Sequence, residues 1–549
     1  MIFMSGRHCP FARIAPRCWL ISKGNRQMFI TRKTNSYAIL FCTTLVLSLG
    51  CLRAGAAVRF ATIFSDHMVL QRGMADPVWG MGTPGQTVKV SFAGHTVLGQ
   101  TNNSGHWMVK LPAMQANANP QTLTVQAGSS TSSVKDILVG DVWLCTGQSN
   151  MTYNLYGWTP GGHGHAAVAK ANYPLIRFVD VPQVTASHPK GSFKASWQVC
   201  SPKTIGWFSA VGYYFGRDLF RKLHVPIGLI ESSWPGTQIQ PWTPLSAVRD
   251  TPQLHGDYLW IKNQEKQYQA QKKAFMTAIA AWLPKARVSL NAGHDIPNPP
   301  AEPWNFITGP GYTSLYNGMI QPLVPFAVRG NIWYQGESNV NDNLYYVRLK
   351  TVIKSWRQAW HQGNFPFYLV EIAPFYYGNP TTGEPVVWNA QENVVRTVPN
   401  TGIVGTQDIG LLNNVHPFDK RDVGYRLSLL ALAKTYGQKG FVYAGPMYKS
   451  MTISDGKAVI HFNYASDGLV SRDGKPLTWF QIAGKNKKFV TAQAAIVGDT
   501  VVVQSPSVPH PTVVRFAWNQ IAVPNLMNKA GLPALPFDTN DAMKPTVPQ

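Results

Sequence analysis

Between residues 136 and 440, short apolar runs alternate with segments of helical periodicity, and this alternation constrains the fold more than any other feature. The apolar runs are 141–146, 225–230, 331–334, 367–372 and 403–408, and the clearest helical segments are 209–223 and 421–436. Strands that alternate with helices are typical of a mostly parallel sheet with helices on its faces. We therefore predict an α/β domain over residues 136–440, with a polar helical insertion at about 255–305.

The regions on either side of this domain, residues 58–135 and 441–549, have a β pattern. Short runs of alternating apolar and polar residues are separated there by Gly, Pro, Asn and Ser, which is typical of small sandwiches. The predicted strands are 60–70, 78–80, 87–92, 107–111 and 122–125 in the first region, and 458–462, 479–482, 494–497, 500–503 and 513–516 in the second. The tail from Pro536 to Gln549 is expected to wrap over the surface.

The first 57 residues have the layout of a secretory signal. Arg32 and Lys33 precede an apolar run over residues 37–49, and Ala54-Gly55-Ala56 supplies an A-x-A cleavage site. The run is too short for an ordinary spanning helix, and no later apolar run is long enough to span a membrane. We predict an exported protein, periplasmic or extracellular.

Two further features of this segment bear on processing. The stretch before Met28 is long for a signal, so we interpret Met28 as the true start. Cys51 follows Gly50, which suggests lipid attachment, but Ser48 stands where an apolar residue is expected. We therefore do not expect a lipid anchor.

Charge and cysteine content exclude several classes of protein. The formal net charge is +23, but the basic residues are scattered and no nucleic-acid motif is present, so we predict no nucleic-acid partner. Of the six cysteines, only Cys145 and Cys200 follow the signal region, and we expect buried free thiols there. No Cys/His spacing indicates a metal site, and we predict neither metal nor cofactor.

Polar clusters follow four of the predicted strands, at the point where each strand ends. They are Gly147-Gln148-Ser149-Asn150-Met151, residues 231–237 with Gly236, Gln335-Gly336-Glu337-Ser338-Asn339, and Val415-His416-Pro417. Open α/β sheets bind ligands in the crevice beyond the carboxyl ends of their strands. The four clusters are therefore expected to meet there and form one site.

The chemistry suited to these residues is nucleophilic catalysis. Ser149 lies at a strand-to-helix turn, where backbone N–H groups stabilise an oxyanion, and His416 is the candidate base. An imidazole base also needs an acid, and Asp408 and Glu337 are both candidates. The expected oxyanion donors are the N–H groups of Ser149 and Gly236 and the side-chain amide of Gln335. Gln148 and Asn150, which flank Ser149, complete the predicted substrate-binding set.

These blocks resemble those of SGNH-type carbohydrate esterases, and in particular the sialate O-acetylesterase family. Besides the four clusters, the resemblance includes the segments 64–72, 315–320 and 525–533 and covers nearly all of residues 58–540. It implies a flavodoxin-like three-layer α/β/α hydrolase domain flanked by β-sandwich-like accessory regions, no metal, and removal of acetyl groups from sugar hydroxyls. Ser149 would be the nucleophile, His416 the base, and Ser149, Gly236 and Gln335 the oxyanion donors.

One departure from the family pattern concerns the acid. The family often has an acid two or three residues before the histidine, and this chain has Asn414 and Asn413 there. The orienting group is therefore Glu337 or Asp408, or the pair is a Ser–His dyad aided by a backbone carbonyl.

The resulting functional hypothesis is a serine esterase that acts through an acetyl-serine intermediate, with an O-acetylated sugar or glycan as its partner. A sialate O-acetylesterase is the first interpretation. An acetylesterase of xylan or another polysaccharide is the alternative of the same chemistry. A non-catalytic carbohydrate-binding protein is the alternative of another class.

Overall fold

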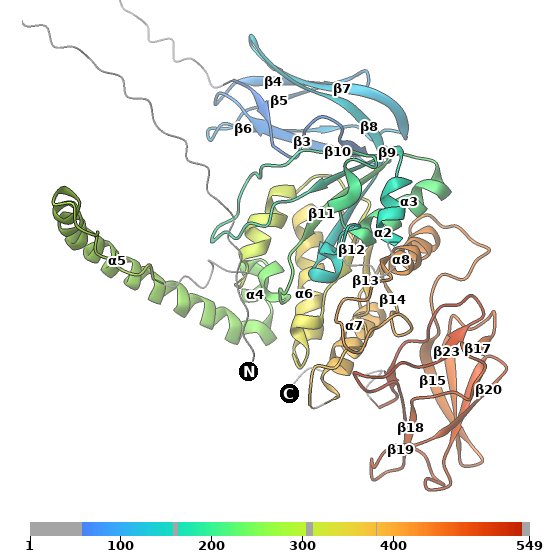
Figure 1. Ribbon diagram of the computed structural model, residues 1–549. Helices are drawn as coiled ribbons and strands as arrows, with labels where there is room; N and C mark the ends of the chain where they lie inside the picture. Colours follow the sequence, from blue (N-terminus) through green and yellow to red (C-terminus); the bar gives the residue numbers. More distant parts are fainter. Residues whose placement is uncertain (1–56, 158–162, 304–310, 380, 541–549) are drawn as a thin grey trace, which may run out of the picture. The chain divides into compact units, whose positions relative to one another are not determined.

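The computed structural model of the chain describes residues 57–157, 163–303, 311–379 and 381–540 (Figure 1). Within it, residues from Gly55 onward group as one compact unit. The predictions about Met28, Cys51 and the signal sequence lie outside the described residues.

A mostly parallel sheet forms the centre of the unit, in the strand order β10-β9-β11-β8-β12-β13-β14, in which only β10 runs antiparallel to its neighbour. The bounds are β8 (Ser130–Gly147), β9 (Tyr173–Asp180), β10 (Gln198–Cys200), β11 (Ile227–Ser233), β12 (Gly330–Tyr334), β13 (Phe367–Val370) and β14 (Thr401–Val404). The prediction of a mostly parallel α/β sheet is confirmed. Differences at the strand ends are small, except that β11 begins and ends later, and β14 begins and ends earlier, than predicted.

The central strand β8 is much longer than the predicted run 141–146. Its first half pairs antiparallel with β7 (Asn117–Ala127), and its second half pairs parallel with β11 and β12. The predicted boundary between residues 135 and 136 therefore lies inside one strand, which pairs with N-terminal strands in its first half and with the parallel strands in its second. The sequence pattern changes at this point because the strand changes its surroundings.

Side chains of β8 alternate between two apolar layers. Trp143 and Cys145 pack with helices α3 (Ala210–Leu223) and α8 (Lys420–Lys434) on one face. Val142 and Leu144 belong to a second cluster on the other face, with α6 (Tyr345–Trp360) and α7 (Gly383–Thr397) (Figure 1). Since both faces are covered, these strands read as continuous apolar runs. The helices predicted at 209–223 and 421–436 are α3 and α8.

The N-terminal region consists of antiparallel strands attached to β8. One small sheet has the order β1-β3-β6, and the other strands continue the central sheet through β7, with β2 parallel to β8. The bounds are β1 (Arg59–Phe60), β2 (Val69–Gln71), β3 (Asp76–Met81), β4 (Thr87–Phe92), β5 (His95–Gln100) and β6 (His106–Leu111). The strand predicted over 60–70 is wrong for its middle part, where the chain turns, and β5 was missed because its side chains are largely exposed.

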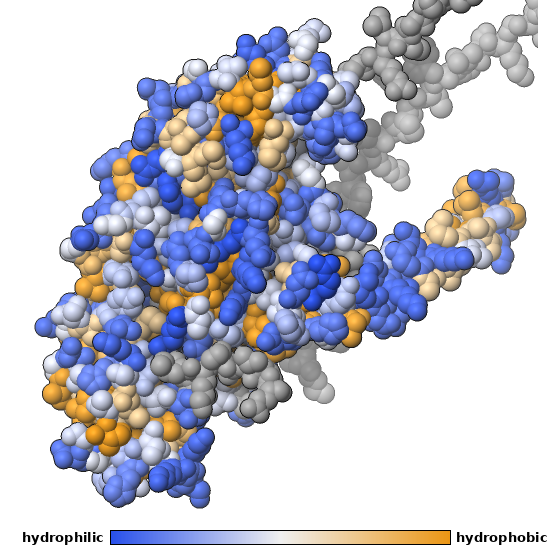
Figure 2. Space-filling view, turned by 180° about the vertical axis from the view of Figure 1, so that it is seen from behind, coloured by the Kyte–Doolittle hydropathy of each residue, from blue (hydrophilic) through white to orange (hydrophobic). Residues whose placement is uncertain are grey.

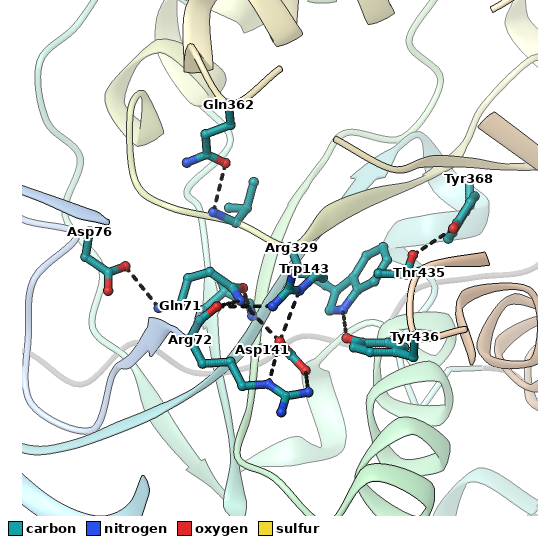
Figure 3. A network of polar contacts seen from close by, with 12 residues as sticks. Gln71, Arg72, Asp76, Asp141, Trp143, Arg329, Gln362, Tyr368, Thr435 and Tyr436 are labelled. Carbon is teal, nitrogen blue, oxygen red and sulfur yellow. Dashed lines mark hydrogen bonds and ion pairs between the residues drawn. The ribbon is translucent and has the colours of Figure 1, made fainter. Parts of the chain in front are cut away.

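A buried polar network joins this region to the start of the parallel sheet (Figure 3). The fully buried Asp141 carboxylate accepts hydrogen bonds from Arg72 Nη2 at 2.8 Å and Arg329 Nε at 3.2 Å. Gln71 Nε2 donates to the same carboxylate at 3.1 Å. Nearby, Trp143 Nε1 donates to the Tyr436 hydroxyl at 3.1 Å. The network lies at the end of the parallel sheet opposite Ser149, so we assign it a structural role.

The C-terminal region forms three small antiparallel sheets around its own apolar cluster. Their strands are β15 (Met447–Ser454), β16 (Lys457–Asn463), β17 (Leu469–Ser471), β18 (Phe480–Ala483), β19 (Val490–Thr491), β20 (Gln493–Val497), β21 (Thr500–Gln504), β22 (Val513–Phe516), β23 (Leu526–Asn528) and β24 (Phe537–Asp538). All five predicted strands of this region are confirmed. The prediction of a surface tail is wrong for its first residues, because β24 pairs with β22 and Phe537 is buried.

The predicted helical insertion is α5 (His255–Asn291), which extends away from the sheet (Figure 1). Of its side chains, Ile261 and Ala286 are buried, and Figure 2 shows mainly hydrophilic side chains along its inner part and a mixture of hydrophilic and hydrophobic ones toward its tip. The remaining helices are short: α1 (Ser149–Thr152), α2 (His163–Ala169) and α4 (Leu245–Arg249). In the described part of the chain, none of the helices has both the length and the apolar character needed to cross a bilayer.

Candidate active site

Ser149 is the first residue of α1 and follows β8 after only Gln148. Gly147 makes this turn with a φ of 138°, and a Cβ there would lie 2.1 Å from the Tyr334 carbonyl oxygen, so only glycine fits. The close approach lets the Gln148 N–H donate to that carbonyl at 3.0 Å. The serine is thus held half-buried at a helix start, where backbone N–H groups have no partner within the helix.

Hydrogen bonds join the second and third clusters to this turn. The Trp234 N–H donates to the Gly147 carbonyl at 3.1 Å, which holds the loop after β11 against the end of β8. Gln148 Oε1 accepts from the N–H groups of Gly336 and Ser338, both at 3.4 Å. The strand ends therefore meet at one edge of the sheet, as the topology requires.

The histidine loop is attached through Asn150, the residue after Ser149. Asn150 Nδ2 donates to the Val415 carbonyl at 3.0 Å, and the ring of His416 lies 6.2 Å from that of Tyr153, the C-cap of α1. The Asn414 side chain accepts the His416 backbone N–H at 2.9 Å. The hydrogen bond from Asn150 to Val415 thus joins the residue after Ser149 to the residue before His416. It brings together two parts of the chain that are far apart in sequence.

A buried charged network surrounds Asn150. Its Nδ2 also donates to Glu337 Oε1 at 2.5 Å, and its Oδ1 accepts from Lys420 Nζ. Burial raises the pKa of Glu337, which the bond from Asn150 and the Lys420 charge oppose. Burial lowers the pKa of Lys420 to about 7, and it also lowers the pKa of His416, with help from the Lys420 charge. Lys420 was missed in the sequence because a lysine at a helix start normally points to solvent.

The two candidate acids have other partners. Arg426 donates to both Asp408 carboxylate oxygens, at 2.8 and 2.6 Å, and Glu337 is bonded to Asn150. Among the described residues, neither acid forms a hydrogen bond with the His416 ring. Asp419, three residues after His416, caps α8 by accepting the Asp422 N–H.

The expected oxyanion donors differ in their availability. Gly236 is exposed, with a φ of 71° and open space around its Cα. Gln335 is fully buried, and its Nε2 donates to the Thr237 carbonyl at 3.2 Å and to Asn339 Oδ1 at 2.7 Å. An amide nitrogen has two hydrogens, so in this arrangement Gln335 holds the loop after β11 and has none to offer an oxyanion.

A pair of carboxyl groups on β9 and β11 is linked to α1 through Ser233. Asp180 and Glu231 are neighbours in register on β9 and β11, so their carboxyl groups lie on the same face of the sheet. Burial raises the pKa of both, that of Asp180 to about 6. Ser233 donates to Glu231 and lies 2.5 Å from the Thr152 hydroxyl in α1. The pair therefore anchors the helix that begins with Ser149.

A cavity of about 410 Å³ adjoins the site between α2, α3 and the start of α8. Tyr153 and Lys420 belong to both its wall and the network around Asn150. The charged residues that line it are Lys170, Arg217, Asp419, Lys420 and Arg421. Basic side chains thus outnumber acidic ones in its wall. No group of three or more His, Cys, Asp and Glu side chains within the described ranges is arranged to hold a metal ion.

Comparison with known proteins agrees with this geometry. Residues 301–425 match the family described as "Carbohydrate esterase, sialic acid-specific acetylesterase". The human sialate O-acetylesterase is 28% identical over 533 residues, which cover 88% of this chain and 93% of that protein. The mouse sialate O-acetylesterase is also 28% identical, over 85% of this chain and 90% of its own length.

A solved structure extends the comparison. The crystal structure of a carbohydrate acetylesterase from Xanthomonas citri is 32% identical, covers 88% of this chain and 99% of its own, and superposes with a TM-score of 0.73. The fold, the site and these relatives define a carbohydrate esterase, which is a carboxylic ester hydrolase. Within that class, the chain belongs to the sialate O-acetylesterase family.

Proposed function

We propose that the protein removes O-acetyl groups from sugars, sialic acids in particular, with Ser149 as nucleophile and His416 as base. The observation that carries the mechanism is the hydrogen bond from Asn150 to the Val415 carbonyl, which brings the serine turn and the histidine loop together. His416 takes the proton of Ser149, and the serine oxygen attacks the acetyl carbonyl. The sugar hydroxyl leaves, and water then hydrolyses the acetyl-serine.

The proposed site is a Ser–His dyad positioned by the backbone. The Asn414 side chain holds the His416 N–H, and Asn150 holds the preceding carbonyl, so the loop is fixed without an acid on the imidazole. The N–H groups of Ser149 and Gly236 remain the proposed oxyanion donors. In this scheme Glu337 acts through Asn150, and Gln148 and Gln335 shape the loops around the oxyanion.

The substrate is proposed from the charge of the adjoining cavity. Its volume of about 410 Å³ is in the range of small-ligand sites. Lys170 in its wall suits a sugar that carries a carboxylate, as sialic acid does, and Arg217 and Arg421 line the same cavity with Asp218 and Asp422 as their ion-pair partners. Acetylated xylan, the alternative, has a neutral backbone and gains nothing from these cations.

We propose the finer organisation on the same basis. Helices on both faces of the sheet support a flavodoxin-like, SGNH-type three-layer domain over residues 136–440, with β accessory regions at 58–135 and 441–549. Residues 1–57 would direct export, so that the esterase acts in the periplasm or outside the cell.

The test is hydrolysis of 4-nitrophenyl acetate and of O-acetylated sialic acid by Ser149→Ala and His416→Ala. Each variant should lose at least about 10³-fold in kcat, because neither residue of a nucleophile–base pair acts alone. The control is Ser187→Ala, which removes an exposed serine bonded to the neighbouring His188 and should keep full activity. Full activity in Ser149→Ala would refute the mechanism. Equal kcat/KM for acetylated xylan and acetylated sialic acid would refute the proposal that sialic acid is the preferred sugar.

A further inference from the structure

Lys420 is an unusual residue for the start of a helix. It is the first residue of α8, lies four positions after His416, and is only 2% exposed. Lysine is among the residues least often buried, because removing an ammonium group from water is costly unless other groups compensate. The groups that surround Lys420 must therefore explain why it is there.

The helix α1 with its C-cap and the end of β12 supply those groups. Nζ donates to Asn150 Oδ1 in α1, and it lies 5.0 Å from the ring centre of Tyr153 and 5.4 Å from that of Tyr334 at the end of β12. Both ring faces attract a cation. Lys420 therefore contacts the serine turn and the end of β12, which leads into the third cluster, while it belongs to the helix that follows the histidine loop.

The ammonium group and the two acceptors on its far side together determine which way the Asn150 amide points. A cation beside one end of the amide requires the oxygen there, so the nitrogen faces Glu337 Oε1 and the Val415 carbonyl. Both of those groups are acceptors and need that nitrogen. A neutral side chain at position 420 would leave the buried Asn150 Oδ1 without this donor, and the link between the histidine loop and the serine turn would be weakened.

The charge of Lys420 also acts on His416. The other charged or titratable groups around the two residues are Glu337 from the loop after β12, Asp419 at the N-cap of α8, and the phenols of Tyr153 and Tyr334. Glu337 and Asp419 favour the charged form of Lys420, while burial disfavours it. A positive charge near an imidazole disfavours its protonation, which adds to the effect of burial in lowering the His416 pKa.

We propose that Lys420 is a positioning residue for ester hydrolysis. Its ammonium group orients the Asn150 amide that joins the serine turn to the histidine loop. Lys420 also lies at the start of the helix that follows the histidine loop, four residues after His416, where a positive charge disfavours protonation of the imidazole. This inference rests on the proposed roles of Ser149 and His416.

The test compares Lys420→Met, Lys420→Arg and Asn150→Ala with the wild-type enzyme over a range of pH, using 4-nitrophenyl acetate. Lys420→Met should lower kcat by about 10- to 100-fold with little change in KM, because a displaced base costs rate rather than binding. It should also move the acid limb of kcat/KM upward by about 0.5 to 1 pH unit, since His416 loses a positive neighbour. Lys420→Arg keeps the charge, so its acid limb should stay in place even if kcat falls.

Two comparisons separate this role from a purely structural one. Lys434→Met removes another lysine of α8, whose Nζ donates to the Thr401 carbonyl, and should leave the pH profile unchanged. The double variant Lys420→Met/Asn150→Ala should be no slower than the worse single variant, because both changes break one link.

The proposal is overturned if the acid limb of Lys420→Met coincides with that of the wild type, or if the losses in the double variant multiply. If Lys420→Met does not fold, an acid limb shifted in Lys420→Arg, or wild-type kcat in Asn150→Ala, would overturn it equally. Full activity in Ser149→Ala would refute the serine mechanism itself, and that outcome is distinct from any result at position 420.

Discussion

At the scale of single residues, the site depends on amide side chains whose donors and acceptors are all assigned by their neighbours. Asn150 receives the Lys420 ammonium at its oxygen and gives its two hydrogens to Glu337 and Val415. Gln335 is occupied in the same way by Thr237 and Asn339. Buried amides with complete sets of partners have a single orientation, which is how backbone loops from different strands are held in register.

Asp408 is one of the two candidate acids that would turn the Ser–His dyad into a triad. Its carboxylate is paired with Arg426, whose side chain is only 5% exposed. We expect Asp408→Asn to lower the free energy of unfolding by about 1–3 kcal/mol, because it weakens a largely buried ion pair. Its kcat for 4-nitrophenyl acetate should stay close to that of the wild type. Urea unfolding and steady-state kinetics measure the two effects, and a loss of kcat as large as in His416→Ala would show that Asp408 orients the histidine.

At the scale of elements, the contact between α3 and α8 positions the histidine loop. The two helices approach closely at Gly424, where an added Cβ would lie 2.7 Å from Tyr214 Cβ and 2.9 Å from the Val211 carbonyl oxygen. These atoms belong to, or lie next to, the α3 backbone and cannot move aside. Because α8 begins at Lys420, any shift of the helix is transmitted to the network around Asn150.

Gly424→Ala tests this contact. Alanine favours helix more than glycine does, so any loss of stability must come from the packing of the two helices. We expect the free energy of unfolding to fall by about 1–3 kcal/mol and kcat to fall with it. Tyr425→Ala, at the exposed next position, is the matched control and should change neither by much. Equal or greater stability of Gly424→Ala in urea would show that the helices can separate without cost.

At the scale of the whole described unit, the strand β8 links the N-terminal strands to the parallel sheet, and Asp141 is the buried charge at that junction. Burial alone would raise the pKa of Asp141, but Arg72 and Arg329 lower it below its ordinary value of 3.8. The stabilising contribution of this carboxylate is therefore complete above about pH 4 and is lost as pH falls through its lowered pKa.

Asp141→Asn should consequently lower the free energy of unfolding by about 3–5 kcal/mol at neutral pH, because two arginines lose their buried counter-ion. The difference from the wild type should shrink in acid, below the pH at which the unfolded wild-type chain becomes protonated. Urea titrations at several pH values measure this trend. Activity at low temperature should persist, since Ser149 lies at the other end of β8, and a difference in stability that grows in acid would contradict the assignment.

Much of this fold was predictable because burial on both faces of a parallel strand leaves a mark in the sequence. The run from Val142 to Cys145 is apolar without interruption, and the strands β12, β13 and β14 were found for the same reason. The strand β5 and the buried start of the tail were not predicted. Exposed edge strands, and short pairings such as that of Phe537, leave no such pattern in the sequence.

The sequence by itself determined the class of fold, the four polar clusters beyond the strand ends, and the pairing of Ser149 with His416 as candidates. These are local patterns, or follow from the rule that parallel strands end at one edge. Only the tertiary structure decided which side chains form hydrogen bonds or ion pairs with each other. Asp408 pairs with Arg426, Gln335 donates to Thr237 and Asn339, and Lys420 lies buried against Asn150. Hydrogen-bond partners far apart in sequence are chosen by distance and burial in the folded chain, and neither quantity is written in the order of the residues.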